Sequence, residues 1–294
     1  MTDRPGNLLE VRDLSVRFGA KEVVRGVNFD IAPGEKLALV GESGSGKTIT
    51  ALSLLRLAGD AVVQGSAVFE GRDLLALSER EMRGVRGGDI AMIFQEPMTA
   101  LNPLMTVGRQ ISEVLELKQA LTQAQSWQAA IELIASTGIP EPERRAAAFP
   151  HQLSGGQRQR AMIAMALASR PKLLLADEPT TALDVTLRGQ ILELLADLQR
   201  QTGMAVLLIT HDLNLVRRFA DRVAVMEQGV LVEQGPVAGI FQAPQHAYTR
   251  RLIASQPRRD VVEGDPDANA KPVLRAQNLR VSYPTPLPGV RGWF

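Results

Sequence analysis

Four short runs of apolar residues recur along the chain and predict the central strands of a sheet. They lie at residues 36–41 (KLALVG), 90–95 (IAMIFQ), 173–179 (LLLADEP) and 205–210 (AVLLIT). Continuous apolar runs of this length are typical of strands buried on both faces, as in parallel sheets covered by helices. Because the runs alternate with helical patterns, the sequence predicts an α/β fold around a mostly parallel sheet.

Two other regions have different patterns. Residues 222–235 (RVAVMEQGVLVEQG) contain two short apolar segments around Gln228-Gly229, which predicts a β-hairpin. Between Thr106 and Thr137 apolar residues recur at helical spacing, and Gly138 follows as a stop signal. That region is predicted to be a helical insertion.

The end of the chain repeats the pattern of its start. After Pro257 a charged stretch (RRDVVEGDPDANAKP) offers little to bury and is predicted to be a linker. The segment KPVLRAQNLRVSY then runs in step with GNLLEVRDLSVRF, so that Leu274 aligns with Leu9 and Tyr283 with Phe18. A chance echo of a strand pattern is the alternative. The position after a linker favours the first strand of a second domain similar to the first.

Composition and charge exclude several classes of function. The 294 residues carry 33 basic and 32 acidic side chains, so there is no global basic field to steer the chain onto nucleic acid or anionic lipid. The chain has no Cys, which excludes disulfides, thiolate catalysis and zinc–thiolate sites. Its N-terminus lacks the apolar core of a signal peptide, and the small-apolar run at 161–168 is too short to span a bilayer. We expect a cytoplasmic chain that does not itself cross a membrane.

The segment GESGSGKT, from Gly41 to Thr48, has the pattern of a phosphate-binding loop between a strand and a helix. Glycines are needed because backbone N–H groups must curl inward around phosphate oxygens, along a path that side chains would obstruct. Lys47 then supplies a cation to the β and γ phosphates, and Thr48 offers a hydroxyl to Mg²⁺. The alternative is a flexible Gly/Ser turn, which the complete pattern and its flanking elements disfavour.

An acidic pair lies at the carboxyl end of the predicted strand at 173–179. Asp177 and Glu178 leave the carboxyl end of that strand, the edge at which open α/β sheets bind ligands. Adjacent side chains diverge there, so Asp177 is predicted to hold Mg²⁺ and Glu178 to act as the base for an attacking water. Without a phosphate loop, the pair would be interpreted as a helix cap or a solvated turn.

The segment LSGGQRQR at 153–160 opens a predicted helix. Ser154 is a candidate N-cap, and Gly155 and Gly156 allow close approach of the backbone to an anion. Alone, such a helix start would be interpreted as a turn. Together with the phosphate loop and LLLADEP, LSGGQ makes the sequence resemble the ATP-binding cassette (ABC) ATPases over nearly its whole length.

The resemblance implies a P-loop NTPase (RecA-like) core with an antiparallel β subdomain and an inserted α-helical subdomain. It places an ABC nucleotide-binding domain at 1–240, with the helical insertion at about 97–170. A C-terminal segment of the kind found in peptide importers is expected at 241–258, and the linker at 259–272. Residues 273–294 are expected to begin a truncated second ABC domain.

The resemblance also implies roles for single residues. Phe18 corresponds to an aromatic that stacks on adenine, with a core phenylalanine as the alternative. Gln95 corresponds to a glutamine that reaches Mg²⁺ and the attacking water, and His211 to a switch histidine that touches the γ-phosphate, with a capping or core role as its alternative. Asp184, the last residue of TALD, lies in a segment that crosses to the opposite cassette.

The complete set of expected site residues combines the motifs and the resemblance. The ATP-binding residues are Phe18, Gly41, Glu42, Ser43, Gly44, Ser45, Gly46, Lys47, Thr48 and Thr50. The catalytic residues are Glu178, His211 and Gln95, and the Mg²⁺ ligands are Thr48, Gln95 and Asp177. The signature residues that act on ATP bound at a partner cassette are Ser154, Gly155, Gly156 and Gln157. The expected cofactors are ATP and Mg²⁺.

The family implies partners as well. Each nucleotide lies between the phosphate loop of one cassette and LSGGQ of another, so a second ABC domain is required, in the same full-length chain or in a homodimer. The terminal repeat favours the first half of a tandem protein. EPMTALNP and the segment 241–257 are similar to ATPases that import dipeptides, oligopeptides and nickel, although Ala247 replaces the usual Pro.

Within that group, the tandem arrangement resembles fused ATPases of peptide importers, including those for microcin C-like peptides and glutathione. Two transmembrane permease subunits are implied, and indirectly an extracytoplasmic solute-binding protein. The chain would lie peripherally on the cytoplasmic face of the inner membrane. The permeases would dock beside Gln95, against a wall that includes Met98 and Leu101.

A non-transport ABC protein acting on nucleic acid or ribosomes is the competing interpretation. Lys47 and Asp177 are too close in sequence for the long coiled coil of chromosome-type members, zinc cysteines are absent, and the linker is short and acidic in its middle. We therefore expect no nucleic-acid partner. A scaffold that binds ATP without hydrolysis would lack Glu178 or His211, and both are present.

Overall fold

The computed structural model describes residues 6–95, 100–181, 183, 185–255 and 275–280. The chain divides into two units, Met1–Gln256 and Pro257–Phe294. In the second unit the described residues 275–280 form neither helix nor strand and are exposed. The second ABC domain expected to begin at 273–294 therefore stays a prediction. Its remaining residues, and the linker expected at 259–272, lie outside the described residues.

The first unit contains a six-stranded sheet, ordered β10-β9-β3-β8-β7-β6. Its bounds are β3 Lys36–Val40, β6 Ile90–Ile93, β7 Leu173–Asp177, β8 Ala205–Thr210, β9 Arg222–Glu227 and β10 Val230–Pro236. The four predicted apolar strands are confirmed as β3, β6, β7 and β8, all parallel. The predicted hairpin is confirmed as the antiparallel pair β9 and β10.

A four-stranded antiparallel sheet, ordered β2-β1-β4-β5, covers one face of this central sheet. Its strands are β1 Leu9–Phe18, β2 Lys21–Ile31, β4 Val62–Phe69 and β5 Arg72–Asp73. Alternate residues of each central strand point to opposite faces. Leu173 and Leu175 accordingly join the core beneath the antiparallel sheet, whereas Leu174 and Ala176 join the core on the other face.

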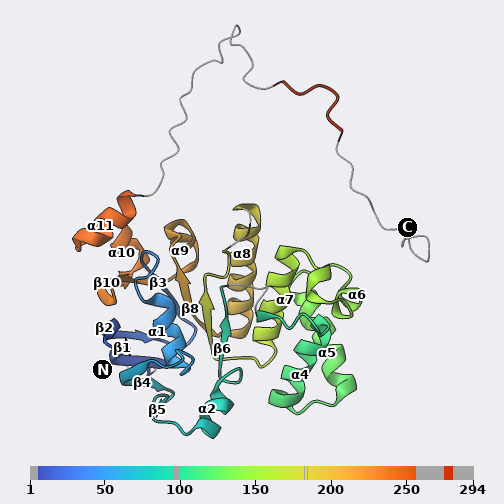
Figure 1. Cartoon of the computed structure of the whole chain (residues 1–294), viewed down its shortest axis with the longest axis horizontal. Coiled ribbons are helices and arrows are strands. Elements are labelled where there is room, and N and C mark those ends of the chain that lie inside the picture. Colours follow the sequence, from blue (N-terminus) through green and yellow to red (C-terminus); the bar gives the residue numbers. More distant parts are fainter. Residues whose placement is uncertain (1–5, 96–99, 182, 184, 256–274, 281–294) are drawn as a thin grey trace, which may run out of the picture. The chain divides into compact units, whose positions relative to one another are not determined.

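Helices complete the first unit (Figure 1). α1 Lys47–Leu54 follows β3, α2 Glu79–Val85 precedes β6, and α8 Val185–Thr202 and α9 Leu213–Phe219 flank β8. α10 Val237–Gln242 and α11 Ala247–Ala254 follow β10. No helix in the described part of the chain is both long enough and apolar enough to cross a bilayer.

The predicted helical insertion is confirmed as a group of helices with its own core. It comprises α4 Val107–Gln119, α5 Gln123–Ser136, α6 Pro142–Ala146, a 3₁₀ turn at Pro150–Gln152 and α7 Gly155–Leu167. Their apolar residues form one cluster that includes Ile111, Leu115, Ile134 and Ala161. Figure 1 shows this group, in green, beside the central sheet. Gly138 ends α5 with φ +74°.

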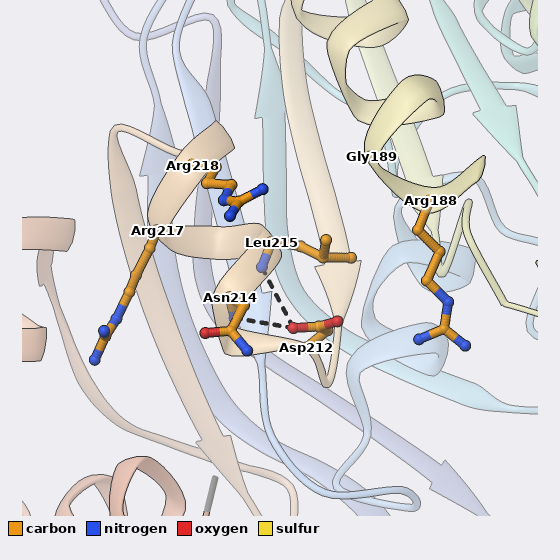
Figure 2. A pocket seen from close by; sticks show the side chains of 7 residues that line it. All are labelled: Arg188, Gly189, Asp212, Asn214, Leu215, Arg217 and Arg218. Atoms are coloured by element: carbon orange, nitrogen blue, oxygen red, sulfur yellow. Dashed lines mark hydrogen bonds between the residues drawn. The ribbon is translucent and has the colours of Figure 1, made fainter. Parts of the chain in front are cut away.

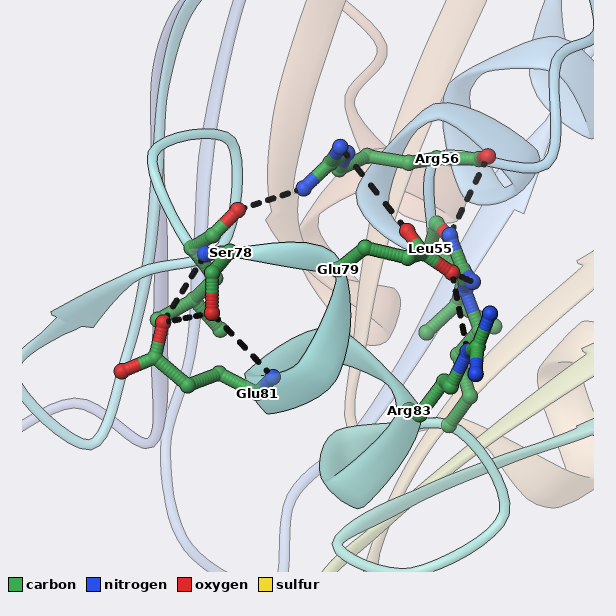
Figure 3. A network of polar contacts seen from close by, with 8 residues as sticks. Leu55, Arg56, Ser78, Glu79, Glu81 and Arg83 are labelled. Atoms are coloured by element: carbon green, nitrogen blue, oxygen red, sulfur yellow. Dashed lines mark hydrogen bonds and ion pairs between the residues drawn. The ribbon is translucent and has the colours of Figure 1, made fainter.

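A polar network joins α2 to the end of α1 (Figure 3). The Arg86 guanidinium donates to the Leu55 carbonyl at 2.7 Å and to the Glu79 carboxylate at 2.7 Å. Arg86 lowers the pKa of Glu79 through this hydrogen bond. On its other side, Lys118 of α4 donates to the carbonyls of Arg83 and Arg86, at 2.7 and 2.8 Å. α2 therefore bonds to both the helix after the phosphate loop and the helical insertion.

Candidate functional site

The segment between β3 and α1 opens onto a pocket of about 300 Å³. Parallel strands end at the same edge of a sheet, so this segment meets the residues that follow β6 and β7. Seven residues expected at the site line the pocket together with two apolar residues that the motifs did not indicate, Val23 and Ile49. The lining residues are Val23, Ser43, Gly44, Gly46, Lys47, Thr48, Ile49, Gln95 and Glu178.

Close backbone packing explains two of the loop glycines. A Cβ on Gly41 would lie 2.1 Å from the Met226 carbonyl oxygen, which is far inside van der Waals contact. Gly46 has φ +104°, and its Cβ would lie 2.8 Å from the Val23 carbonyl oxygen. The loop is therefore pressed against β2 and β9, and neither position accepts a side chain without moving a strand.

Lys47 is buried, and its ammonium is held by the loop that it belongs to. Nζ donates to the carbonyls of Gly41 at 2.9 Å and Glu42 at 2.8 Å, and to the Ser45 hydroxyl at 3.3 Å. Burial lowers the pKa of Lys47, while the carboxylates of Glu178, Asp177 and Glu42 act in the opposite direction. The cation is thus placed at the pocket wall before any ligand arrives.

Asp177 and Thr48 form the part of the site that suits a hard cation. The Thr48 hydroxyl donates to Asp177 Oδ1 at 3.1 Å, and the Asp177 side chain is almost completely buried. Burial raises the pKa of Asp177 to about 6, against the hydrogen bond from Thr48. Among the described residues no group of three or more His, Asp or Glu could hold an ion alone. This donor set fits Mg²⁺, which commonly takes one or two protein oxygens and completes its shell with phosphates and water.

The raised pKa of Asp177 predicts a pH-dependent cost of burying its charge in the ligand-free protein. Because the folded pKa of about 6 exceeds the unfolded value near 3.8, this group stabilises the fold below about pH 4 and loses that contribution as pH rises through 6. Two pKa units correspond to roughly 3 kcal/mol. Denaturant titrations in EDTA should show Asp177→Asn gaining stability relative to wild type between pH 4 and 8. A difference independent of pH would contradict this ionisation.

Glu178 follows β7 and is the centre of a second set of contacts. The Thr181 hydroxyl donates to its Oε2 at 2.7 Å, and Nδ1 of His211 lies 2.9 Å from Oε1. The Gln95 amide lies at the edge of hydrogen-bonding distance, 3.5 Å from Oε2. Burial raises the pKa of Glu178, but the bonds from Thr181 and His211 and the nearby Lys47 charge outweigh it, so the pKa is lowered. The carboxylate is therefore held in its ionised form.

Thr181 was not predicted as a site residue. Its position three residues after Glu178 could have indicated a contact with that carboxylate.

Phe18 lies at the end of β1 and is 37% exposed, but it does not line the pocket. Its adenine contact remains a prediction. Thr50 requires a correction: it is fully buried, and its hydroxyl donates to the Gly46 carbonyl at 2.9 Å. Its side chain therefore braces the loop and does not reach the pocket.

The signature segment caps its helix as the sequence predicted. The Gln157 N–H donates to the Ser154 hydroxyl at 3.2 Å, and the Ser154 N–H donates to the Gln157 side chain at 3.1 Å. Gly155 is exposed with open space around it, and Gly156 packs against Leu187. None of the four signature residues lines the loop pocket. Asp184 lies outside the described residues.

A larger hollow of about 610 Å³ lies between α8 and α9 (Figure 2). Two of its polar residues are engaged in local structure: Asp212 caps α9 by accepting the N–H groups of Asn214 and Leu215, and Arg188 donates to the Leu183 carbonyl. The hollow contains none of the residues expected to bind nucleotide. Volume alone therefore does not identify the site, and the chemistry favours the smaller loop pocket.

Comparison with known proteins identifies the family. The sequence model of the ABC transporter family matches residues 24–181, just over half of the chain. The chain belongs to the ABC transporter family. Among solved structures, the dimeric ATP-binding cassette MJ0796 in a post-hydrolysis state with ADP and Pi is 29% identical to this ABC chain. That match has a TM-score of 0.69 and covers 78% of this chain and 98% of MJ0796.

Among curated proteins, this ABC chain is 57% identical to the peptidoglycan transport ATP-binding protein YejF of Agrobacterium fabrum. The match covers 94% of this chain and 52% of YejF, so the chain spans about half the length of that relative. It is 50% identical to the oligopeptide transport ATP-binding protein OppD of Bacillus subtilis, over 95% of this chain and 83% of OppD. The solved structure of cbiO1 from Clostridium perfringens is 27% identical to this chain, with a TM-score of 0.71. That match covers 81% of this chain and 91% of cbiO1. The expected P-loop fold is confirmed by these structural matches.

Proposed function

We propose that this chain is the ATP-binding and ATP-hydrolysing subunit of an ABC importer for peptides or related small solutes. The observation that carries the proposal is that Lys47 and Glu178 line one pocket at the phosphate loop, where the lining residue Thr48 is hydrogen-bonded to Asp177. The similarity to OppD supports peptides as the solute class. A nucleic-acid or ribosome ATPase is not favoured, because the curated relatives described above are named as transport proteins.

We propose a part in hydrolysis for each of these residues. Loop N–H groups and the Lys47 ammonium would bind the β and γ phosphates, where positive charge stabilises the charge that develops in phosphoryl transfer. Thr48 and Asp177 would hold Mg²⁺, which neutralises phosphate charge when bound. Glu178 would orient the attacking water and accept its proton, with His211 and Thr181 fixing the carboxylate.

The pocket does not include the signature residues, which supports a site shared between two cassettes. MJ0796 is described as dimeric, and the repeat near residue 274 supports a second cassette encoded in a longer chain. We propose pairing with such a cassette, or with a second copy. More specifically, we propose that the two cassettes are fused in one tandem protein and that the importer is of the microcin C type.

Phosphate release from Mg-ATP tests the proposal. The isolated 294-residue chain should show low ATPase activity whose specific rate rises with protein concentration, because the active unit is a transient pair. Supplying the second cassette in trans should raise the rate strongly. No phosphate release under either condition would contradict the function. A high rate independent of concentration from a monomer by light scattering would contradict the shared site.

Transport also requires membrane partners, and we propose two permease subunits that hold the chain peripherally at the cytoplasmic face. An extracytoplasmic binding protein would act through them, and co-purification with two multi-spanning subunits tests this arrangement.

The expected docking wall needs one correction, because Leu101 is 2% exposed. A charged residue at this buried position would destabilise its surroundings, so the substitution could not test docking. Met98 lies outside the described residues, whereas Leu104 is 84% exposed and suits a docking test.

A further inference from the structure

The two helices after β10 pack against the sheet edge from which the phosphate loop leaves. α10 and α11, here called the C-terminal helical pair (Val237–Ala254), lie beside β10 and α9 (Figure 1). Ile240 and Tyr248 of the pair share one apolar cluster with Val40, the last residue of β3. Gly41 is the next residue in the chain, so the pair is anchored directly beside the start of the loop.

Polar contacts fix the position of this pair. Glu233 of β10 accepts the N–H groups of Gln245 and His246 ahead of α11, at 2.8 and 3.0 Å. The Arg217 guanidinium of α9 lies 4.4 Å from the centre of the Phe241 ring. In Figure 2 the Arg217 side chain accordingly points away from Asp212 and Arg188. The pair is thus tied both to the hairpin and to the helix that follows the predicted switch histidine.

Tyr248 of α11 contacts the phosphate loop itself. Its ring is 4% exposed, and its hydroxyl oxygen accepts the backbone N–H of Glu42 at 3.0 Å. The same peptide unit carries the Gly41 carbonyl, which accepts the Lys47 ammonium at 2.9 Å. One peptide plane is therefore held at its N–H end by Tyr248 and at its C=O end by Lys47.

We propose that Tyr248 is a positioning residue for the phosphate loop, which acts by fixing the Gly41–Glu42 peptide that orients Lys47. The proposal rests on the proposed function, because the orientation of Lys47 matters only if phosphate binds there. Lys47 has three N–H donors, and its longest contact is with Ser45 at 3.3 Å. A phosphate oxygen takes that donor, while the Gly41 and Glu42 carbonyls keep the ammonium in place.

The chemistry of Tyr248 suits this role. Burial raises the pKa of its phenol, with the Glu42 N–H acting in the opposite direction, so the group stays neutral at physiological pH. A neutral hydroxyl oxygen accepts an N–H without adding a negative charge near the incoming phosphates. A carboxylate in the same place would accept the N–H but would also repel the nucleotide.

Tyr248→Phe tests the proposal because it keeps the buried ring and removes only the acceptor. Isothermal titration of Mg-ATP should give a dissociation constant about three- to tenfold weaker than wild type, the size of one lost hydrogen bond. Thr249→Val is the matched control, since it removes a neighbouring buried hydroxyl from the same helix and leaves the Glu42 contact intact. It should bind Mg-ATP as wild type does. Unfolding temperatures without nucleotide should be similar for the two variants.

The outcomes separate this proposal from the proposed function. If wild type does not bind Mg-ATP, the proposed function fails. If wild type binds and Tyr248→Phe binds equally well, or if Thr249→Val loses as much affinity, the positioning role is overturned and the function stands. Amide hydrogen exchange of wild type adds a test that needs no variant. Glu42 is exposed, yet its N–H should be protected, and fast exchange would overturn the proposal.

Discussion

Glu178→Gln is expected to lower the rate of ATP hydrolysis by roughly 10²- to 10⁴-fold while Mg-ATP affinity stays close to wild type. Gln keeps the size of the side chain and an oxygen that can accept the Thr181 hydroxyl, but an amide cannot take the proton of an attacking water. Phosphate release at saturating Mg-ATP measures the rate, and equilibrium titration measures the affinity. Any second cassette in the assay must carry its own silencing substitution.

Glu193→Gln is the matched control for that experiment. Glu193 is an exposed carboxylate on α8 at the edge of a separate hollow, so its loss should leave hydrolysis unchanged. Undiminished turnover by Glu178→Gln would remove Glu178 from the role of base. Equal losses in both variants would point to a general effect of charge instead of proton transfer.

Lys47→Ala is expected to abolish the rise in melting temperature that Mg-ATP gives the wild-type chain. A ligand that binds only the folded state at 100 times its dissociation constant stabilises it by about 2.7 kcal/mol, which for a domain of this size raises the melting temperature by several degrees. The variant loses the cation that the loop holds at the pocket wall. Thermal melts with and without Mg-ATP provide the measurement.

Lys172→Ala serves as the control, because Lys172 is an exposed lysine paired with Glu70 by a 2.7 Å contact outside the pocket. It should retain the full nucleotide-dependent rise. A rise that persists in Lys47→Ala would mean that the phosphate loop is not where the nucleotide binds. A rise lost from both variants would indicate that the assay reports charge at the surface.

The sequence predicted the parts of the fold that local patterns determine. The strand ending at Asp177 could be recognised because its first four residues, Leu173–Ala176, are apolar. Such a continuous run is typical of a strand that is buried on both faces, as this one is. The Ser154 cap could be recognised because a capping box needs only residues three apart. The loop glycines could be recognised because their sequence pattern is specific. That pattern does not indicate that Gly41 and Gly46 pack against β9 and β2.

Contacts between distant segments could not be predicted in the same way. The Tyr248 hydroxyl meets Glu42 across 206 residues of sequence, and no local pattern pairs them. Thr50 was included in the expected ATP-binding set, but its helix turns it inward, where it is fully buried. Leu101 was placed on a docking wall because it follows Gln95 closely, whereas tertiary packing buries it. In each case packing, which the sequence pattern does not contain, determines which way the side chain points.

The central claim is that one nucleotide site is built from the phosphate loop, Asp177 and Glu178. A crystal structure of the Glu178→Gln protein with Mg-ATP tests it most directly, because the substitution should trap the unhydrolysed nucleotide. We predict the triphosphate inside the loop from Gly41 to Thr48, with Lys47 on its phosphates and Mg²⁺ at the Thr48 hydroxyl beside Asp177. A nucleotide bound elsewhere, for example in the arginine-lined hollow between α8 and α9, with the loop pocket empty, would contradict the account.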